Sequence, residues 1–359
     1  MHIKQLKSFQ LVTKRFSGKL QTLWLSARLK NSLLVAHCSL LIAFIGCASN
    51  LEKQLNHYNM GVEYYKKEMF DEAIKELETA VKINPNLGDA HHALGRAYIK
   101  KGSTNDAIAS YKKALEIGPN SAELHGDLAL AYNHKGLIDE SILEYREAIE
   151  IEPKNAKWHN KLGRLYHHSG MLEDAVLEYN RILNYEPENS EAHYNLGTLF
   201  IDMGLVDDAT TEFNKALEVN PNDEGSHYQL EMIYYAKGMV EQAIAELEKA
   251  IEINPKFVEA YNNLGFIYYE KGMYDEALNN FKKALEIDPN YEQVHNNVGL
   301  IYIEKEMLDE AQKSFEKAVE LNPEYAEAHN NLGYIYHKKG LKDKAIREVL
   351  IYKRLIGQE

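Results

Sequence analysis

The sequence predicts an all-α solenoid, in which similar helical hairpins stack one on another. Two observations carry this prediction. The eight prolines of the 359-residue chain recur at a single spacing of 34 residues, and apolar side chains repeat at helical spacing within each period. The prolines are Pro85, Pro119, Pro153, Pro187, Pro221, Pro255, Pro289 and Pro323. A fixed period of this length is typical of repeat proteins, in which each unit contacts mainly its neighbours.

Each period contains two apolar stripes. Residues 54–359 divide into nine full periods when Gln54 is counted as repeat position 1. Apolar or small residues at positions 4, 7, 8 and 11 form one helical stripe, and positions 20, 24 and 27 form a second. Position 11 is aromatic in every repeat, and small residues at positions 8 and 20 allow two helices to approach closely. One hairpin cannot bury both stripes alone, so we expect its stability to come from stacking.

Small and polar residues predict where each helix begins and ends. Glycine near position 15 is expected to end the first helix. These glycines are Gly102, Gly136, Gly170, Gly204, Gly238, Gly272 and Gly340. Asp or Asn near position 18, such as Asp71 and Asp275, is expected to cap the second helix. The proline at position 32 is expected at the start of the next helix, where a missing N–H is tolerated.

The pattern over residues 54–359 resembles the tetratricopeptide repeat family. The resemblance implies a right-handed superhelix of nine helix-turn-helix repeats, whose first helices line a concave groove that binds a protein or peptide. Two departures are Glu231, which replaces the small residue at position 8, and Glu306, which replaces the glycine at position 15. Ile182 and Tyr352 replace the alanine at position 27. These departures affect local packing rather than the fold.

The first 46 residues are predicted to be a leader that is separate from the repeats. Residues 1–47 hold seven Lys and Arg and no Asp or Glu, and an apolar run from Leu33 to Ile45 follows the basic stretch. That run is shorter than the about 20 residues of a membrane-spanning helix and fits a secretory signal. Phe44-Ile45-Gly46-Cys47 resembles a bacterial lipobox, which implies that residues 1–46 are removed and Cys47 is acylated. Ordinary cleavage after Ala48 and an uncleaved anchor remain alternatives.

The leader also predicts a location. We expect the bacterial cell envelope, with residues 47–53 as a short tether between the lipid and the repeats. By analogy with lipoproteins, Ala48 rather than Asp after the cysteine favours the periplasmic side of the outer membrane. A soluble secreted or periplasmic protein is the alternative.

Composition and motifs exclude several classes of function. Residues after Cys47 carry all 54 Asp and Glu but only 34 of the 41 Lys and Arg, so the repeats are acidic and unsuited to nucleic-acid binding. Two cysteines cannot form a disulfide framework. The chain has no nucleophile elbow, phosphate-binding loop, zinc-protease motif or paired-cysteine cluster. We therefore expect no enzymatic activity, no cofactor and no metal.

Histidine at position 4 is the most conspicuous candidate for metal binding. The residues are His57, His91, His125, His159, His193, His227, His295 and His329, and Tyr261 takes this position in the seventh repeat. Each histidine belongs to a different hairpin, whereas bonds from zinc to nitrogen are only about 2.0–2.1 Å long. The prediction is therefore that these histidines pack or form hydrogen bonds.

Side-chain amides form the candidate binding site. In the family, positions 2, 5, 6, 9, 12 and 13 tend to face the groove, and position 6 is an amide in the last five repeats. An amide has donors and an acceptor, so it can pair with both backbone groups of an extended peptide. The candidate residues are Asn195, Gln229, Asn262, Asn263, Asn296, Asn297, Asn330, Asn331, Phe266 and Tyr334. The row looks like the asparagine ladder of O-linked N-acetylglucosamine transferases, whose catalytic domain is absent. The alternative is that some amides only bond neighbouring helices.

The sequence favours a non-enzymatic, membrane-tethered scaffold that binds an extended segment of a protein partner in its groove. The alternative is an assembly factor of a secretion, pilus or polysaccharide-export complex that acts through its outer surface or its ends. Leu350 and Ile351 leave an apolar edge on the last helix. A frayed end or self-association through the C-terminal repeat would each account for that edge.

Overall fold

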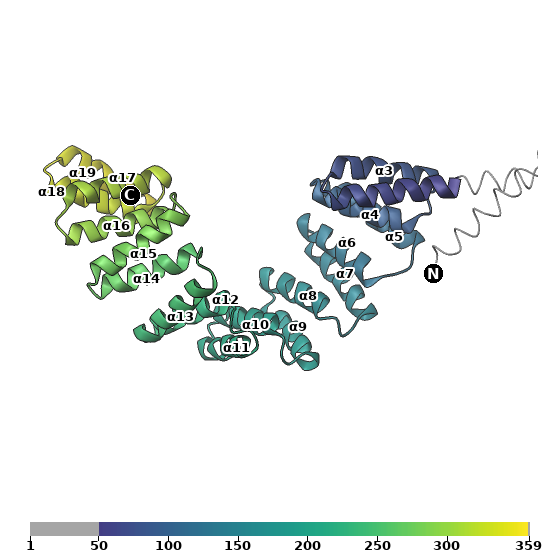
Figure 1. Cartoon of the computed structure of the whole chain (residues 1–359), viewed down its shortest axis with the longest axis horizontal. Helices are drawn as coiled ribbons and strands as arrows, with labels where there is room; N and C mark the ends of the chain where they lie inside the picture. Colours follow the sequence, from purple (N-terminus) through teal and green to yellow (C-terminus); the bar gives the residue numbers. More distant parts are fainter. Residues whose placement is uncertain (1–49, 358–359) are drawn as a thin grey trace, which may run out of the picture. The chain divides into compact units, whose positions relative to one another are not determined.

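The computed structural model describes residues 50–357, which are helical apart from short turns and contain no strand (Figure 1). The first helices of the hairpins cover residues 50–66, then α4 (Gly88–Lys100), α6 (Ala122–His134), α8 (Ala156–His168), α10 (Ser190–Asp202), α12 (Glu224–Ala236), α14 (Val258–Glu270), α16 (Glu292–Glu304) and α18 (Ala326–Lys338). The second helices are α3 (Phe70–Ile83), α5 (Thr104–Ile117), α7 (Ile138–Ile151), α9 (Leu172–Tyr185), α11 (Val206–Val219), α13 (Val240–Ile253), α15 (Tyr274–Ile287), α17 (Leu308–Leu321) and α19 (Lys342–Leu355). The predicted all-α solenoid of helical hairpins is confirmed.

The helices form two compact units that divide between Trp158 and His159. Unit 1 contains the helix over residues 50–66, α3–α7 and the first residues of α8. Unit 2 contains the rest of α8 and α9–α19. Within each unit, helices that follow one another pack side by side, first within a hairpin and then between hairpins (Figure 1).

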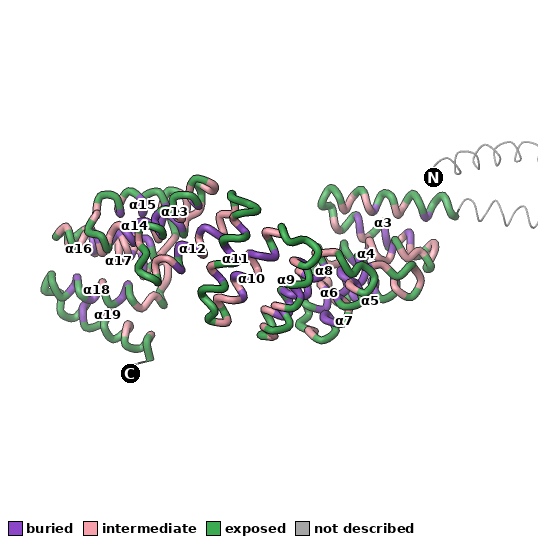
Figure 2. Tube along the Cα trace, turned by 90° about the horizontal axis from the view of Figure 1, so that it is seen from below, coloured by how far each residue is buried: buried purple, intermediate pink, exposed green. Residues whose placement is uncertain are grey.

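Aromatic rings and glycines bring the two helices of a hairpin together. Phe213, Phe281 and Phe315 at position 24 are fully buried. A Cβ atom on Gly197 would lie 2.8 Å from the ring of Phe213, which is closer than carbon atoms can approach. A small residue at position 8 is therefore required in the hairpins that have a phenylalanine at position 24, as the sequence predicted. Buried and exposed residues alternate along the helices, because each helix turns one side towards its neighbours (Figure 2).

The predicted ends of the first helices are also confirmed. The glycines at position 15 adopt the left-handed conformation, with φ between +71° and +77°. Glu306 occupies the same position in the eighth repeat and keeps this conformation, with φ of +58°. A glutamate here carries the steric cost that glycine avoids. The departure changes local strain and leaves the turn intact.

The predicted caps of the second helices are wrong. These helices begin two residues earlier than expected, so the N-cap is a residue such as Met69 or Met273, and neither side chain makes a capping hydrogen bond. Asp71 and Asp275 lie inside the first turn, where a negative charge favours the positive end of the helix dipole. Each also pairs with a lysine of the next repeat: Lys101 Nζ lies 2.8 Å from Asp71, and Lys305 Nζ lies 2.5 Å from Asp275.

The prolines also differ from the prediction. Pro85 directly follows Asn84, the C-cap of α3, and α4 begins only at Gly88. The proline therefore follows the end of the second helix, where it prevents the helix from continuing, and does not occupy the first turn of the next one.

The predicted leader and the lipidation site Cys47 lie outside the described residues. Between residues 50 and 357, no helix combines the length and the apolar character needed to cross a bilayer.

Candidate functional site

The candidate residues lie on one face of the first helices of unit 2. Positions 6 and 9 are three residues apart on a helix and therefore neighbours on its surface. In α12, α14, α16 and α18 they pair an amide with an apolar side chain. The pairs are Gln229 with Met232, Asn263 with Phe266, Asn297 with Leu300, and Asn331 with Tyr334. We call this surface the first-helix face.

Hydrogen bonds join the amides of neighbouring first helices. Asn297 Nδ2 donates to Asn262 Oδ1 over 2.9 Å, and Asn331 Nδ2 donates to Asn296 Oδ1 over the same distance. Both bonds run from position 6 of one repeat to position 5 of the repeat before it. Asn195 makes the same bond to Asn160, also at 2.9 Å. The amide row therefore links helices that are not consecutive in the chain.

This network leaves several polar groups open to a ligand. An asparagine side chain has two N–H groups and an oxygen with two lone pairs. Asn297 and Asn331 each use one N–H between helices, and their oxygens accept no hydrogen bond from the described residues. Asn330 is exposed, and Gln229 is partly buried. Asn262 and Asn296 are buried, 8% and 4% exposed, so their main contacts are between helices.

Asn263 has a different partner from the other amides. Its Nδ2 donates to Glu231 Oε2 over 3.0 Å and lies 3.4 Å from the hydroxyl of Tyr228. Glu231 occupies position 8, the small position of other repeats, and is only 3% exposed. Burial raises the pKa of Glu231 to about 7, and the hydrogen bond from Asn263 opposes that rise. Burial thus moves the pKa of a carboxyl group that is hydrogen-bonded to the amide row towards neutral pH.

The apolar part of the face is accessible. Met232 is 49% exposed and Tyr334 is 45% exposed, while Phe266 and Leu300 are partly buried. Phe266 also lies against Tyr269, with ring centroids 6.3 Å apart. The candidates Phe266 and Tyr334 are thus part of a longer apolar row. Met232 and Leu300 occupy the same repeat position, which is the signal that would have identified them from the sequence.

Acidic side chains border the face on α14, α16 and α18. Glu259, Glu270, Glu304 and Glu327 are exposed at positions 2 and 13. Tyr235 of α12 donates a hydrogen bond to Glu270. Lys338 is a basic residue at one of these positions, and its Nζ lies 5.4 Å from the ring centroid of Tyr334. The surroundings of the amide row are therefore predominantly negative.

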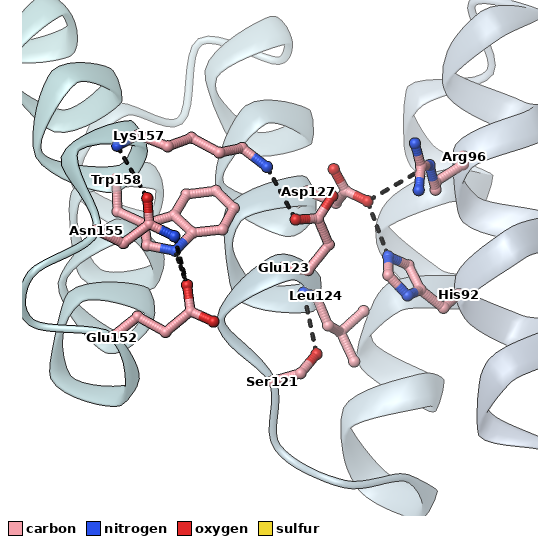
Figure 3. Close-up of polar contacts among 10 residues, drawn as sticks. All are labelled: His92, Arg96, Ser121, Glu123, Leu124, Asp127, Glu152, Asn155, Lys157 and Trp158. Carbon is pink, nitrogen blue, oxygen red and sulfur yellow. Dashed lines mark hydrogen bonds and ion pairs between the residues drawn. The ribbon is translucent and has the colours of Figure 1, made fainter.

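Unit 1 presents different chemistry on its first helices (Figure 3). His92 Nε2 lies 2.8 Å from Asp127 Oδ2, and Arg96 Nε lies 3.7 Å from the same oxygen. Lys157 Nζ pairs with Glu123 at 2.8 Å. Acidic residues of α6 thus partly neutralise Arg96 and Lys157, and the described residues of unit 1 have no row of amides.

A pocket of about 390 Å³ lies between the helix over residues 50–66 and α4. Its lining includes Tyr58, Val62, Tyr65, His92 and Arg96. These residues occupy positions 5, 9 and 12, so the first helices of unit 1 also present a recess on this side.

The histidines at position 4 form hydrogen bonds, as predicted. His193 Nδ1 lies 2.6 Å from Glu212 Oε2 on the second helix of the same hairpin, and its Nε2 lies 3.0 Å from the carbonyl oxygen of Pro187. Because a carbonyl can only accept, Nε2 carries a hydrogen. Analogous pairs to glutamate occur at His57, His125, His159, His227 and His329. These six histidines therefore link the two helices of their own hairpin, whereas among the described residues the rings of His91 and His295 bond only to the carbonyl oxygens of Pro85 and Pro289.

Comparison with known families identifies the fold. A family profile described as TPR repeat matches residues 61–102, 95–136, 130–170, 232–272 and 299–340. Two profiles described as tetratricopeptide repeat match residues 258–291 and 166–230. The chain belongs to the tetratricopeptide repeat (TPR) family. These matches are to repeats of a scaffold fold and not to a catalytic family.

Solved structures of TPR proteins share this fold. A TPR protein from Parabacteroides merdae is 21% identical, with a TM-score of 0.51, and the match covers 69% of this chain and 98% of that one. The C-terminal part of a TPR protein from Cytophaga hutchinsonii is 15% identical, with a TM-score of 0.55 and coverage of 67% and 99%. YrrB, described as a TPR protein with an unusual peptide-binding site, is 26% identical, with a TM-score of 0.44 and coverage of 51% and 95%. No curated protein matches the chain.

Proposed function

We propose that this TPR protein is a non-enzymatic scaffold that holds an extended segment of a protein partner on the first-helix face of unit 2. The observation that carries the proposal is the amide row. Asn195, Asn297 and Asn331 are held in place by hydrogen bonds between helices, and Asn297 and Asn331 still have an N–H and an oxygen to offer. Exposed apolar side chains directly beside the row would bury ligand side chains.

We further propose that acylation of Cys47 tethers the scaffold to a membrane of the bacterial cell envelope, on the periplasmic side of the outer membrane. Residues 47–53 would then be the link to the repeats. The basic, apolar and lipobox-like segments of residues 1–47 support this part of the proposal.

The test is a crosslinking pull-down from membranes that compares the wild-type chain with the triple variant Asn263→Ala/Asn297→Ala/Asn331→Ala. Each lost hydrogen bond is worth about 0.5–1.5 kcal/mol, so three together should clearly weaken a ligand of this face. A matched control is Asn214→Ala, an exposed amide on the second helix α11. The proposal predicts that one partner is lost only from the triple variant, while circular dichroism shows that its helices remain. An unchanged set of partners would reject the role of the amide row.

A second candidate function rests on the last helix. Ile346 and Leu350 of α19 are 59% and 61% exposed, and basic residues such as Arg347 lie beside them. An assembly factor that docks through this end, or self-association through the C-terminal repeat, would cover these side chains. This candidate predicts a complex that survives the triple amide variant and is lost in Ile346→Glu/Leu350→Glu.

A further inference from the structure

The spacing of the first helices limits which extended conformation can follow the face. Asn263 bonds to Glu231, Asn297 to Asn262 and Asn331 to Asn296, so α12, α14, α16 and α18 are successive neighbours on this face. Packed helices lie about 8–10 Å apart. Equivalent side chains of adjacent repeats therefore recur at about that interval.

The apolar row uses this interval. Met232, Phe266, Leu300 and Tyr334 are the same repeat position in four successive first helices. A ligand that contacts each of them in turn must present an apolar side chain on one side about every 8–10 Å. The amides beside them repeat at the same interval, so the backbone groups of the ligand that they contact must also recur at this distance.

Only one common extended conformation has this step. A β-strand presents residues on one side every second residue, which is about 6.6–6.8 Å, and its next matching interval is about 13 Å. Polyproline II has three residues per turn and a rise of about 3.1 Å, so the same side recurs about every 9.3 Å. Its backbone N–H and C=O groups make no internal hydrogen bonds, which leaves them free for side-chain amides.

The surrounding side chains suit the same kind of ligand. Phe266, Tyr269 and Tyr334 offer aromatic surface, on which polyproline II segments commonly dock. The exposed residues Glu259, Glu270 and Glu304 favour positive charge in the ligand. Proline would fix the conformation before binding and so reduce the entropy that ordering the ligand costs.

We propose that the first-helix face of unit 2 binds a segment in the polyproline II conformation, with an apolar residue at every third position and proline and basic residues between them. This inference rests on the proposed function, since it specifies the ligand of the same face. It adds a spacing and a charge, which a general affinity for extended peptides does not require.

The experiment measures fluorescence anisotropy of labelled peptides with the purified full chain in detergent. The first peptide repeats Leu-Pro-Lys four times. Two others have the same composition, with leucine at every second position in one and leucines in adjacent pairs in the other. We expect the three-residue period to bind at least about tenfold tighter than either rearranged peptide. We also expect Phe266→Ala/Leu300→Ala to remove most of this preference. Leu177→Ala, which truncates an exposed leucine on the second helix α9, is the matched control and should preserve it.

Equal saturable binding of the three peptides would overturn the inference and leave the proposed function standing, because the face would then accept any extended chain. Persistence of the preference in Phe266→Ala/Leu300→Ala would also overturn the inference, and it would count against the proposed binding face as well, because the binding would then lie elsewhere. If the triple amide variant loses its membrane partner but the three peptides bind equally, the proposed function stands and the polyproline II inference fails.

Discussion

The buried carboxyl group of Glu231 leads to a prediction about stability and pH. Glu231 is 3% exposed, and its hydrogen-bond partner is Asn263. Burial raises its pKa from 4.5 to about 7 in the folded protein. Between these two values the unfolded chain loses the proton while the folded chain keeps it, so the free energy of unfolding falls as pH rises. The stabilisation is complete below pH 4.5 and is lost as the pH passes about 7.

The magnitude follows from the size of the shift. One pKa unit corresponds to 1.36 kcal/mol, so a rise from 4.5 to about 7 amounts to about 3 kcal/mol between the acidic and alkaline limits. Between pH 5 and pH 8 the wild-type chain should lose about 2–3 kcal/mol through this group. Glu231→Gln keeps the size and the hydrogen-bond acceptor but cannot ionise. It should therefore remove this part of the pH dependence.

Repeat proteins open locally, so the measurement should report on the sixth repeat itself. Hydrogen exchange of the amides of α12 and α13 in the wild-type chain and in Glu231→Gln, compared at pH 5 and at pH 8, gives the local free energy of opening. The expected result is a variant that is more protected than the wild type at pH 8, with a much smaller difference at pH 5. Glu252→Gln, which changes an exposed carboxyl of α13, is the control. Parallel pH dependence in the wild type and Glu231→Gln would refute the reasoning.

Three further predictions concern single residues. Gly197→Leu should lower the free energy of unfolding by about 1–3 kcal/mol or more, because a side chain there collides with Phe213, and an unchanged urea unfolding curve would contradict this packing. Tyr179→Phe should leave stability unchanged or raise it by up to about 1–3 kcal/mol, because the buried Tyr179 hydroxyl has no hydrogen-bond partner among the described residues. Thermal unfolding checks this, and a clear loss of stability would show that the hydroxyl is bonded. Cys47→Ala should release the protein from membranes, and fractionation that remains unchanged would reject lipidation at this residue.

The repeat period predicted the fold because the packing of the two helices in a hairpin depends on residues within one repeat. In most hairpins an aromatic residue at position 24 meets a glycine at position 8, so their spacing indicates how the two helices pack. The same logic predicted Gly204 in the left-handed turn, since that conformation is local to the chain.

The errors at the helix ends have a common physical cause. Asp and Asn are equally typical of an N-cap and of the first turn, so Asp71 was compatible with both positions. The structure places the acidic residue in the first turn even in α7 and α9, where Asp139 and Glu173 have no lysine 30 residues further on, so the start of the helix is set within the hairpin. Lys101 lies 30 residues further along the chain and reaches Asp71 from the next hairpin. The same pair, a lysine at position 14 that lies 30 residues after an acidic residue at position 18, recurs at Lys237, Lys271 and Lys305. The periodic pairing could therefore have been found in the sequence.

The partners of the amides could not be predicted, because they depend on how far one hairpin rotates against the next. The sequence places Asn296 and Asn297 on adjacent positions of a helix and gives them similar prospects as ligand contacts. In the structure, Asn296 is 4% exposed and accepts from Asn331, whereas Asn297 is partly exposed and donates to Asn262. The way in which neighbouring repeats pack therefore decides that Asn296 joins helices while Asn297 stays accessible to a ligand.

The two roles of the amide row can be separated at its C-terminal end. Asn296 Oδ1 accepts the bond from Asn331, so Asn296→Ala removes a link between α16 and α18 and also frees Asn331 to rotate. Asn330 is exposed and makes no side-chain hydrogen bond with any described residue, so Asn330→Ala removes only what a ligand would contact. If the face binds a peptide backbone, Asn330→Ala weakens binding without a change in stability, and Asn296→Ala weakens both. If the amides only join helices, Asn296→Ala is destabilising and Asn330→Ala has no effect on either quantity. The contrast between these two positions therefore distinguishes a binding surface from a structural network.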